Sequence, residues 1–222
     1  ALSVSYSPLT SLPMVIPGAR TSKNHIHAEA TRILDLSLPE EQILAQMHQK
    51  GRYNIKVAER DAVAVEESRD IEAFHKLLQE TGERDRFGIL PLSRYKAFLE
   101  NLEGSFLLLA FVHDKPIAGL LGVIYGDTGI YYYGASSYEH RALMAPYALQ
   151  WAAMRLCKAK GCTNYDLLGI APPNSSASHP WARLSDFKAK FGGSVVTYPP
   201  EQEVVLRPVV KGLLELKRRV LG

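Results

Sequence analysis

The amino-acid sequence predicts an α/β (α+β) fold in which helices flank a central mixed, mostly antiparallel sheet. Hydrophobic residues make up 46% and charged residues 22% of the 222 positions, a composition typical of globular proteins. Two apolar runs, residues 106–113 and 116–125, are separated only by Asp114 and Lys115, a connection short enough to join antiparallel strands. Residues 146–160 then carry apolar side chains at helical spacing. This composition excludes a disordered chain, and the length suits one large domain or one complete domain with part of another.

A first helix is predicted directly after Ser37. Ser37, Pro39 and Glu40 supply an N-cap, a first-turn proline and the capping-box glutamate three residues after the serine. Apolar side chains continue at helical spacing beyond them, but Gly51 interrupts the pattern. We therefore expect a long or broken helix over residues 38–60.

The rest of the chain alternates between strand and helix patterns. Gly161 stands where a left-handed C-terminal cap belongs, and Gly192-Gly193 ends a later helix. The patterns predict strands over residues 62–66, 106–113, 116–125, 130–134, 165–168, 195–198 and 203–207, and helices over residues 70–80, 92–102, 146–160, 181–191 and 208–222. The order of these elements over residues 62–207 resembles the GNAT acyltransferase fold.

Charge, hydropathy and cysteine content narrow the class of protein. The formal net charge is +3, which permits an anionic substrate or an RNA partner without requiring one. The longest apolar stretch, residues 106–112, is far shorter than the roughly 20 residues of a membrane-spanning helix, so we expect neither a spanning segment nor a signal peptide. Cys157 and Cys162 are too few for a disulfide framework or a zinc site. We expect a cytoplasmic protein that binds no metal.

The GNAT-like order of elements raises the question of an acetyl-CoA cofactor. That cofactor is held by a glycine-rich turn, whose backbone N–H groups surround the pyrophosphate at a helix N-terminus. The equivalent residues 139–146 contain no glycine, and Pro146 removes one backbone donor. The sequence therefore argues against binding of acyl-CoA. A GNAT-type acyl-CoA N-acyltransferase remains only as the alternative function.

A basic segment after residue 49 is a candidate binding surface. It concentrates four basic side chains around one aromatic ring and one amide, namely Lys50, Arg52, Lys56, Arg60, Tyr53 and Asn54. Arginine and lysine side chains placed in this way can bind phosphate, and an arginine offers a bidentate contact. On charge alone, a solvated helix face explains the same pattern.

Four stretches, taken in order, resemble the FemABX family, the aminoacyl-tRNA-dependent transferases that build peptide bridges on peptidoglycan precursors. The first stretch, residues 34–63, includes the basic segment. Residues 131–136 resemble the family's tyrosine-rich strand, and residues 165–170 resemble its buried strand before the active-site loop. Residues 184–193 contain the family's Phe-Lys-x-x-Phe-Gly signature. The joint occurrence of these stretches in order is more specific than any one of them.

The resemblance implies a protein of two GNAT-like halves. Such a protein transfers an amino acid from aminoacyl-tRNA, its co-substrate, to the stem-peptide amine of a peptidoglycan precursor, either lipid II or UDP-muramyl pentapeptide. Family members usually carry a longer segment before the equivalent of Asp35, so we expect residues 1–37 to be a remnant of the N-terminal GNAT-like subdomain. A connecting basic helix over residues 38–60, a GNAT-like domain over residues 61–207 and an amphipathic helix over residues 208–222 would follow.

The resemblance also implies roles for individual residues. Lys188 would stabilise negative charge on the tRNA acceptor end or on the reacting ester, with Phe187 packed beneath it. Tyr131 and Tyr133 are expected on one face of their strand, because side chains alternate. The expected substrate-binding residues are Lys50, Arg52, Tyr53, Asn54, Lys56, Tyr131, Tyr133 and Ser136. Aromatic packing of the tyrosines and an exposed helix lysine are the purely structural alternatives.

Several points stay open at the level of sequence. No general base is assigned, since Asp166 is expected in a buried strand and Glu139 in a turn. The C-terminal basic helix with Lys211, Lys217, Arg218 and Arg219 suits tRNA, the anionic inner leaflet of the membrane, or simple closure of the fold. A non-catalytic GNAT-like domain that binds precursor or RNA is a second alternative function. The sequence leaves undecided which amino acid is transferred, which carrier holds the acceptor and which oligomeric state the protein adopts.

Overall fold

The computed structural model describes residues 1–8, 16–22, 27–212 and 214. The chain divides into two compact units, and each unit is assembled from separate segments of the sequence. The larger unit comprises Arg32–Leu168 and Arg183–Ser194. The smaller unit comprises Ala1–Thr31, Gly169–Ala182 and Val195–Gly222.

The described elements follow one another as the sequence patterns predict from residue 62 onward, with additional strands before that point. In chain order they are β1 (Ser3–Tyr6), β2 (Ala19–Thr21), β3 (Ala30–Asp35), α1 (Glu40–Gln46), α2 (Gln49–Arg60), β4 (Ala64–Ser68), α3 (Ile71–Asp85), α4 (Leu92–Asn101), β5 (Ser105–Val112), β6 (Lys115–Tyr125), β7 (Thr128–Ser136), the short 3-10 helix η1 (Arg141–Leu143), α5 (Ala145–Ala159), β8 (Asn164–Asp166), α6 (Ala182–Ala189), β9 (Ser194–Thr197) and β10 (Gln202–Val205).

The main sheet has seven strands in the order β4-β5-β6-β7-β8-β3-β9. Strands β4 to β7 pair antiparallel in sequence order, and β3 pairs antiparallel with β8. Strand β8 runs parallel to β7, because helix α5 crosses over between them. The predicted mixed, mostly antiparallel sheet is therefore confirmed.

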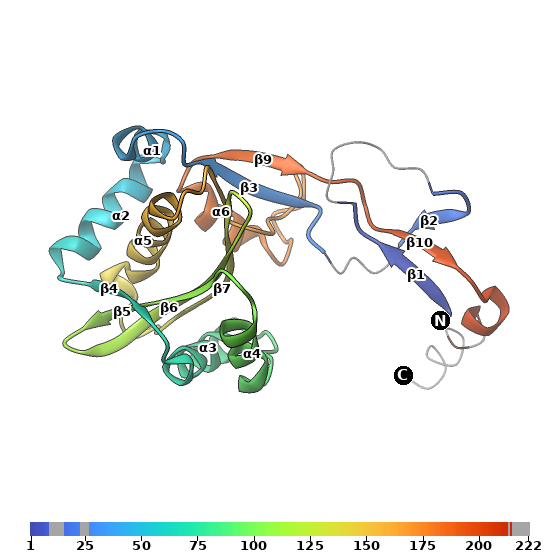
Figure 1. Cartoon of the computed structure of the whole chain (residues 1–222), viewed down its shortest axis with the longest axis horizontal. Coiled ribbons are helices and arrows are strands. Elements are labelled where there is room, and N and C mark those ends of the chain that lie inside the picture. Colours follow the sequence, from blue (N-terminus) through green and yellow to red (C-terminus); the bar gives the residue numbers. More distant parts are fainter. Residues whose placement is uncertain (9–15, 23–26, 213, 215–222) are drawn as a thin grey trace. The chain divides into compact units, whose positions relative to one another are not determined.

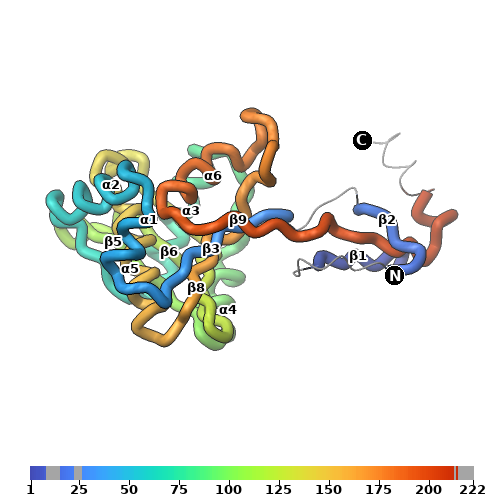
Figure 2. The backbone as a smooth tube through the Cα atoms, turned by 90° about the horizontal axis from the view of Figure 1, so that it is seen from above, coloured from blue at the N-terminus to red at the C-terminus, as the bar shows by residue number. Residues whose placement is uncertain are grey.

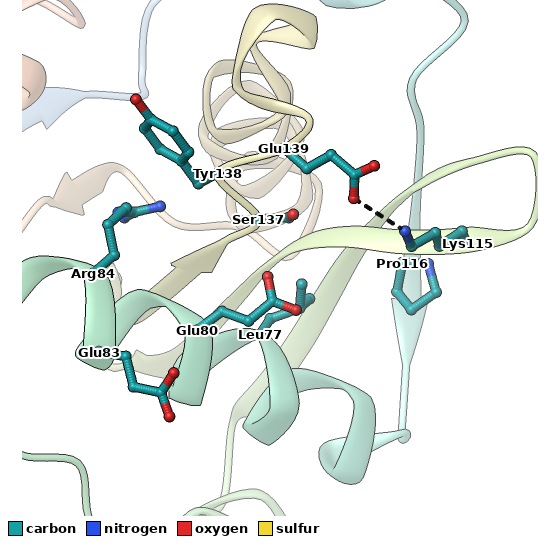
Figure 3. A pocket seen from close by; sticks show the side chains of 9 residues that line it. All are labelled: Leu77, Glu80, Glu83, Arg84, Lys115, Pro116, Ser137, Tyr138 and Glu139. Carbon is teal, nitrogen blue, oxygen red and sulfur yellow. Dashed lines mark ion pairs between the residues drawn. The ribbon is translucent and has the colours of Figure 1, made fainter.

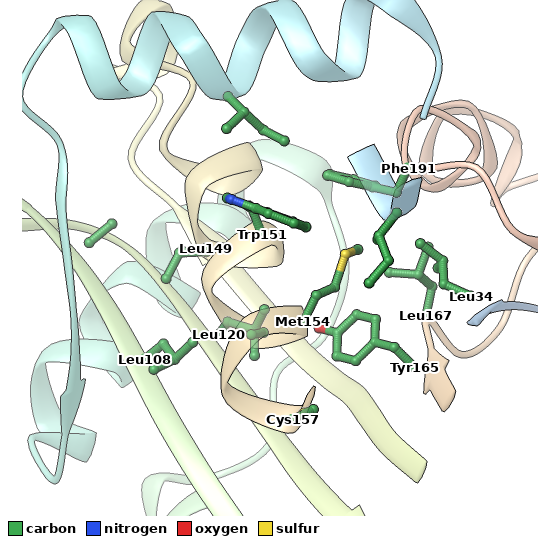
Figure 4. Packing of buried hydrophobic residues seen from close by; sticks show 14 of the residues in the cluster. Leu34, Leu108, Leu120, Leu149, Trp151, Met154, Cys157, Tyr165, Leu167 and Phe191 are labelled. Carbon is green, nitrogen blue, oxygen red and sulfur yellow. The ribbon is translucent and has the colours of Figure 1, made fainter. Parts of the chain in front are cut away.

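Apolar side chains on both faces of this sheet form two hydrophobic clusters. Along β5, Phe106 and Leu108 belong to one cluster while Leu107 and Leu109 belong to the other, because successive side chains of a strand point to opposite faces. Helices α3 and α4 cover the second cluster, and α5, with α2 packed against it, covers the first (Figure 1). Figure 4 shows the apolar side chains of α5, Met154 among them, directed at the strands. The sheet is thus buried on both sides.

The predicted helix over residues 38–60 is broken, but not at Gly51. Helix α1 ends at Gln46, Met47 is extended, and the His48 ring accepts the Lys50 backbone N–H as the N-cap of α2. Gly51 lies inside α2, where a Cβ atom would collide with the backbone carbonyl of Lys190. The glycine therefore permits close packing of two backbones and does not interrupt the helix.

The smaller unit is built on a three-stranded sheet in which β10 lies between β1 and β2 (Figure 2). Both pairings are antiparallel. The Glu203 carboxylate on β10 forms ion pairs with Arg20 and Lys211. The hydrogen bond from Lys211 is the main cause that lowers the pKa of Glu203 to about 2. Charged and polar contacts thus contribute directly to this small sheet.

Two sequence predictions concern the C-terminus and the cysteines. Of the helix predicted over residues 208–222, residues 208–212 are helical, while Lys217 and the two arginines after it lie outside the described residues. Cys157 and Cys162 are buried with free thiols, and burial raises the pKa of both. Among the described residues, no helix combines the length and the apolar character needed to cross a membrane.

Candidate active site

The Phe-Lys-x-x-Phe-Gly signature forms helix α6 and the tight turn after it. Gly192 and Gly193 both adopt left-handed backbone angles, with φ of 82° and 75°. The Arg32 guanidinium donates to both of their carbonyl oxygens, at 3.0 and 2.8 Å. A Cβ atom at either glycine would press on the backbone carbonyl of a neighbouring segment. Only glycine suits these two positions, because the backbone has a positive φ and because no space exists for a Cβ atom.

The same turn fastens α6 to the basic helix α2. The His48 backbone N–H donates to the Lys190 carbonyl at 3.1 Å, and Gly51 lies against that carbonyl. Phe191 is fully buried in the core between them. Two of the four stretches that carry the family resemblance are thus in direct backbone contact.

Lys188 is buried, although a lysine in an eight-residue helix would ordinarily extend into solvent. Its residue is 3% exposed, and its Nζ donates to the carbonyl oxygen of Leu168 at 3.1 Å. The Nζ atom also lies 5.6 Å from the centre of the Tyr131 ring, within range of a cation–π contact. Desolvation lowers the pKa of Lys188 to about 8, and the charge of Asp166 opposes that shift. An ammonium with such a pKa can lose its proton near neutral pH.

The Leu168 carbonyl is held in place by an unusual backbone conformation. Leu168 has φ of 58°, in the left-handed region that residues other than glycine rarely adopt. The Asp166 Oδ1 atom accepts the Leu168 backbone N–H at 2.7 Å, which closes an Asx turn at the end of β8. This turn determines where the carbonyl that binds Lys188 lies.

Tyr131 and Tyr133 lie on opposite faces of the sheet, so the expectation that they share a face is wrong. The pairing of β6 with β7 slips between Leu121 and Gly122, and Tyr132 is the extra residue. Such a β-bulge cancels the simple alternation of side chains. Tyr131 therefore packs with the cluster below α5, whereas Tyr133 joins the cluster below α3 and α4, with its ring 5.0 Å from that of Tyr95.

The two phenols have different surroundings as a result. The Tyr131 phenol is enclosed above Gly134, and burial raises the pKa of Tyr131 to about 12. Burial also raises the pKa of Tyr133, helped by the neighbouring Tyr132 and Tyr95. Of the two, only Tyr131 contacts Lys188 through an interaction that the structure records.

Phe187 contributes to a separate aromatic cluster beside the buried lysine. Its ring packs edge-on against those of Tyr147 and Phe191, with ring centres 5.2 Å apart in each case. The cluster borders a cavity of about 130 Å³ at the N-terminus of α5. The cavity is lined by Ile117, Ser136, Ser137, His140, Arg141, Met144, Ala145, Pro146, Tyr147 and Phe187. Ser136 thus lies where a substrate group could reach it.

The predicted binding residues of α2 separate into exposed and interior ones. Lys50, Tyr53 and Lys56 are exposed, with 61% of Tyr53 accessible. The Arg52 guanidinium donates to the Met47 carbonyl and so closes the C-terminus of α1. Asn54 is 3% exposed and is directed inward, which contradicts the expectation of a surface amide. Lys50, Lys56 and Tyr53 therefore lie on the exposed face of α2, as does Arg60, which pairs with Asp61.

A larger and more polar pocket opens at the end of β7 (Figure 3). Its volume is about 510 Å³, and α3, the start of β6 and the residues after β7 line it. The Lys115 ammonium pairs with Glu139 at 3.5 Å on its rim, and Arg84 donates to the Ser136 carbonyl at 3.0 Å. Acidic and basic groups are mixed in this pocket, so its charge favours no single class of ligand.

The turn before α5 is arranged differently from a pyrophosphate-binding turn. The backbone N–H groups of Leu143 and Met144 donate to the carbonyls of His140 and Arg141 within the turn. Met144, the residue before α5, is itself left-handed with φ of 53°, and Pro146 in the first turn has no N–H group. Few free donors therefore point outward from this helix N-terminus.

Some residues of the site were not predicted from the sequence. The Asx turn of Asp166 was missed because the residue was interpreted as part of a buried strand, although an aspartate at the end of a short strand is a recognised turn signal. Tyr147 was interpreted as part of the apolar stripe of a helix. His140 and Arg141 carried no motif that would have distinguished them from surface residues.

Comparison with solved structures places the fold among known proteins, whereas no curated protein matches the chain. The structure of FemX has a TM-score of 0.78 at 19% identity, and the match covers 89% of this chain and 68% of FemX. The C-terminal domain of a putative lysylphosphatidylglycerol synthetase from Agrobacterium fabrum has a TM-score of 0.58 at 14% identity, covering 92% of this chain and 66% of that one. L-PGS from Bacillus licheniformis has a TM-score of 0.57 at 12% identity, covering 92% and 68%.

The chain spans about two thirds of the length of each of these proteins. At such low identity the likeness concerns the fold, and the predicted GNAT-like architecture agrees with it. The evidence for the family comes from the sequence itself. Residues 18–115 and 110–216 match the FemAB family, and together they include all four stretches on which the resemblance was based. The chain therefore belongs to the FemAB family.

Proposed function

We propose that this protein is an aminoacyltransferase that moves an amino acid from aminoacyl-tRNA to the stem-peptide amine of a peptidoglycan precursor, lipid II or UDP-muramyl pentapeptide. Membership of the FemAB family supports the class of reaction. The single observation that carries the proposal is the buried ammonium of Lys188, held by the Leu168 carbonyl at 3.1 Å within the family signature. A buried lysine of lowered pKa is typical of a reactive site.

The proposed reaction is an aminolysis of an activated ester. The free amine of the stem peptide attacks the ester carbonyl carbon, a C–N bond forms, and the carbonyl oxygen gains negative charge. The C–O bond to the tRNA ribose then breaks, and the ribose oxygen leaves with the electron pair and takes up a proton, while the attacking nitrogen releases one, so that an amide and a free ribose hydroxyl result. Stabilisation of the oxyanion and alignment of the two substrates supply most of the rate in reactions of this kind.

Lys188 is the proposed source of that stabilisation. With a pKa of about 8, its ammonium is still mostly protonated at pH 7 and can donate a hydrogen bond to the oxyanion or a proton to the leaving oxygen. The surrounding apolar groups strengthen this interaction, because a charge acts more strongly where water is excluded. Phe187 would support the lysine from the neighbouring position on α6.

Two features near helix α6 suggest where the two substrates bind: Phe187 of α6 lines the cavity at the N-terminus of α5, and α2 packs on the turn after α6. The cavity of about 130 Å³ beside Phe187 has space for one small group, and its apolar floor suits the aminoacyl end of the donor. The exposed Lys50, Tyr53 and Lys56 on α2 suit the phosphates of the acceptor. Tyr131 would support the lysine from beneath. Tyr133 packs half-buried among aromatic rings on the other face of the sheet, Asn54 is buried, and neither is assigned to substrate.

The reaction also suggests a location for the protein. Charged tRNA is a cytoplasmic substrate, so we assign the protein to the cytoplasm, with peripheral contact at the inner membrane face if the acceptor is lipid-linked. Lys211 is already paired with Glu203 and would not contribute to that contact. Any contribution from Lys217, Arg218 and Arg219 lies outside the described residues.

Mass spectrometry of the acceptor tests the proposal. UDP-muramyl pentapeptide and lipid II are incubated separately with the protein and a pool of charged tRNAs, and acetyl-CoA replaces the tRNA in a parallel sample. We expect a mass increment equal to one amino-acid residue that disappears after RNase treatment, and its size names the amino acid. An acetyl increment would instead support the acyl-CoA alternative. Precursor binding without any product would support the binding-domain alternative.

A further inference from the structure

The end of β8 forms an Asx turn, between Asp166 and Leu168, that has no role in the proposed reaction as described so far. We infer that Asp166 is a positioning residue for Lys188: its carboxylate fixes the backbone of Leu168, whose carbonyl holds the lysine ammonium. The importance of this positioning for catalysis rests on the proposed function. The contacts among Asp166, Leu168 and Lys188 are themselves independent of which substrates bind.

The first contact sets the backbone. The Asp166 Oδ1 atom accepts the Leu168 N–H at 2.7 Å, and Leu168 adopts a left-handed φ of 58°. A leucine in that region costs roughly 1–2 kcal/mol, so it persists only where the surroundings enforce it. The next residue in the chain is a glycine, which would adopt the conformation without cost. The strain is therefore placed on the residue whose carbonyl contacts Lys188.

The second contact transmits this geometry to the lysine. The Lys188 Nζ donates to the Leu168 carbonyl at 3.1 Å, and the lysine has almost no access to water. The ammonium is thus bound to a carbonyl whose direction the Asx turn determines. This contact fixes the position of the Nζ atom relative to the sheet, as a group that stabilises an oxyanion requires.

The carboxylate also acts on the lysine through its charge. Two groups that act on Lys188 come from neighbouring strands, Asp166 on β8 and the Tyr131 ring on β7. Tyr165, the residue before Asp166 on β8, directs its phenol to Gln150 at 2.9 Å, and burial raises its pKa strongly, so it stays neutral. The negative charge of Asp166 favours the charged form of the buried lysine against desolvation. The two effects of Asp166, on direction and on charge, can be separated by mutation.

Two substitutions at the same position separate them. Asp166→Asn keeps an oxygen that can accept the Leu168 N–H but removes the charge, whereas Asp166→Ala removes both. Asp127→Asn is the matched control, because Asp127 is also a turn carboxylate with hydrogen-bonded partners, Thr128 and Thr163, and does not contact Lys188 through any recorded interaction. The titration of Lys188 is followed by NMR of labelled lysine side chains in the whole chain, with Lys188→Met used to assign its signal.

We expect Asp166→Asn to lower the Lys188 titration midpoint by about 1 pH unit while the Leu168 amide signal stays in place. Asp166→Ala should lower the midpoint as well and also displace the Leu168 amide signal. A Lys188 midpoint unchanged in Asp166→Asn, or shifted equally by Asp127→Asn, would overturn the inference, and Asp166→Asn decides it if the alanine variant does not fold. Because the readout is a titration, a lowered midpoint in a protein that transfers no amino acid would refute the proposed function and leave the positioning role intact.

Discussion

The two units of the molecule are stabilised in different ways. In the larger unit, two apolar clusters enclose the sheet from both sides, and every member of both clusters belongs to that unit. In the smaller unit, the strands β1, β10 and β2 are joined through ladder hydrogen bonds and through Glu203, which pairs with Arg20 and Lys211. The larger unit thus depends on packing, whereas the smaller one depends more on charge.

This difference explains why the candidate site can contain a buried ammonium. Holding Lys188 away from water costs free energy, which only a well-packed surrounding can offset. Phe191 and the turn at Gly192 supply such packing within the larger unit. The small sheet also contains a buried charge, Glu203 at 8% exposure, but there ion pairs with Arg20 and Lys211 offset the loss of hydration.

The largest effect is expected from a cavity in the larger unit. Phe74 is fully buried between α3 and the sheet, so Phe74→Ala should lower the free energy of unfolding by roughly 3–5 kcal/mol. Val4 of the small sheet is 52% exposed, and Val4→Ala should change it by less than about 0.5 kcal/mol. Urea unfolding of both variants measures the contrast. Equal losses would show that the two units do not differ in their dependence on packing.

A smaller loss of stability is expected at Gly51, where the backbone of α2 contacts the backbone of Lys190. In most helices a glycine-to-alanine change is favourable by about 1 kcal/mol, but the Cβ of Gly51→Ala would collide with the Lys190 carbonyl. We expect a net destabilisation of roughly 1–3 kcal/mol, the usual cost of overpacking. Gly88→Ala is the control, since no atom lies within 4 Å of its added Cβ. A stabilised Gly51→Ala variant would contradict the close packing of α2 on the α6 turn.

The smallest effect is a loss of stability of the three-stranded sheet at acidic pH. Because the folded-state pKa of Glu203 lies near 2, below the ordinary value of 4.5, its stabilising contribution is complete above pH 4.5 and disappears as the pH falls toward 2. Amide hydrogen exchange of β10 should therefore accelerate over this range, beyond the intrinsic pH effect, while exchange of β5 does not. In Glu203→Gln the pH dependence should vanish. Persistence of the acid effect in that variant would assign it to another group.

Sequence patterns predicted the elements from β4 onward because most of these elements, such as β5, β6 and α5, are long enough to show a clear apolar pattern. Strands β1, β2 and β3 were missed. They are short, three to six residues, and they pair with strands more than a hundred residues away, such as β10 and β8. A local sequence pattern does not indicate pairing with a strand so far away in the chain.

The candidate site was predicted less completely than the fold, and for physical reasons. Lys188 and Phe187 were predicted to lie on one helix, and α6 contains both, but the burial of the lysine involves a contact with the distant Leu168. The bulge at Tyr132 reverses the alternation that placed Tyr131 and Tyr133 on one face, and a single inserted residue leaves no trace in composition or period. Family resemblance supplied the candidate residues, and only the three-dimensional structure could show which of their side chains meet.

The most direct measurement compares amino-acid transfer by Lys188→Met with transfer by the wild type and by Lys160→Met, a lysine exposed at the end of α5. Calorimetry of UDP-muramyl pentapeptide binding accompanies the assay, so that loss of catalysis is distinguished from loss of binding. We expect Lys188→Met to reduce the rate of transfer by about 100-fold or more with acceptor binding retained, as for removal of an oxyanion donor, and Lys160→Met to leave it unchanged. A Lys188→Met enzyme with the rate of the wild type would contradict the role of the buried ammonium.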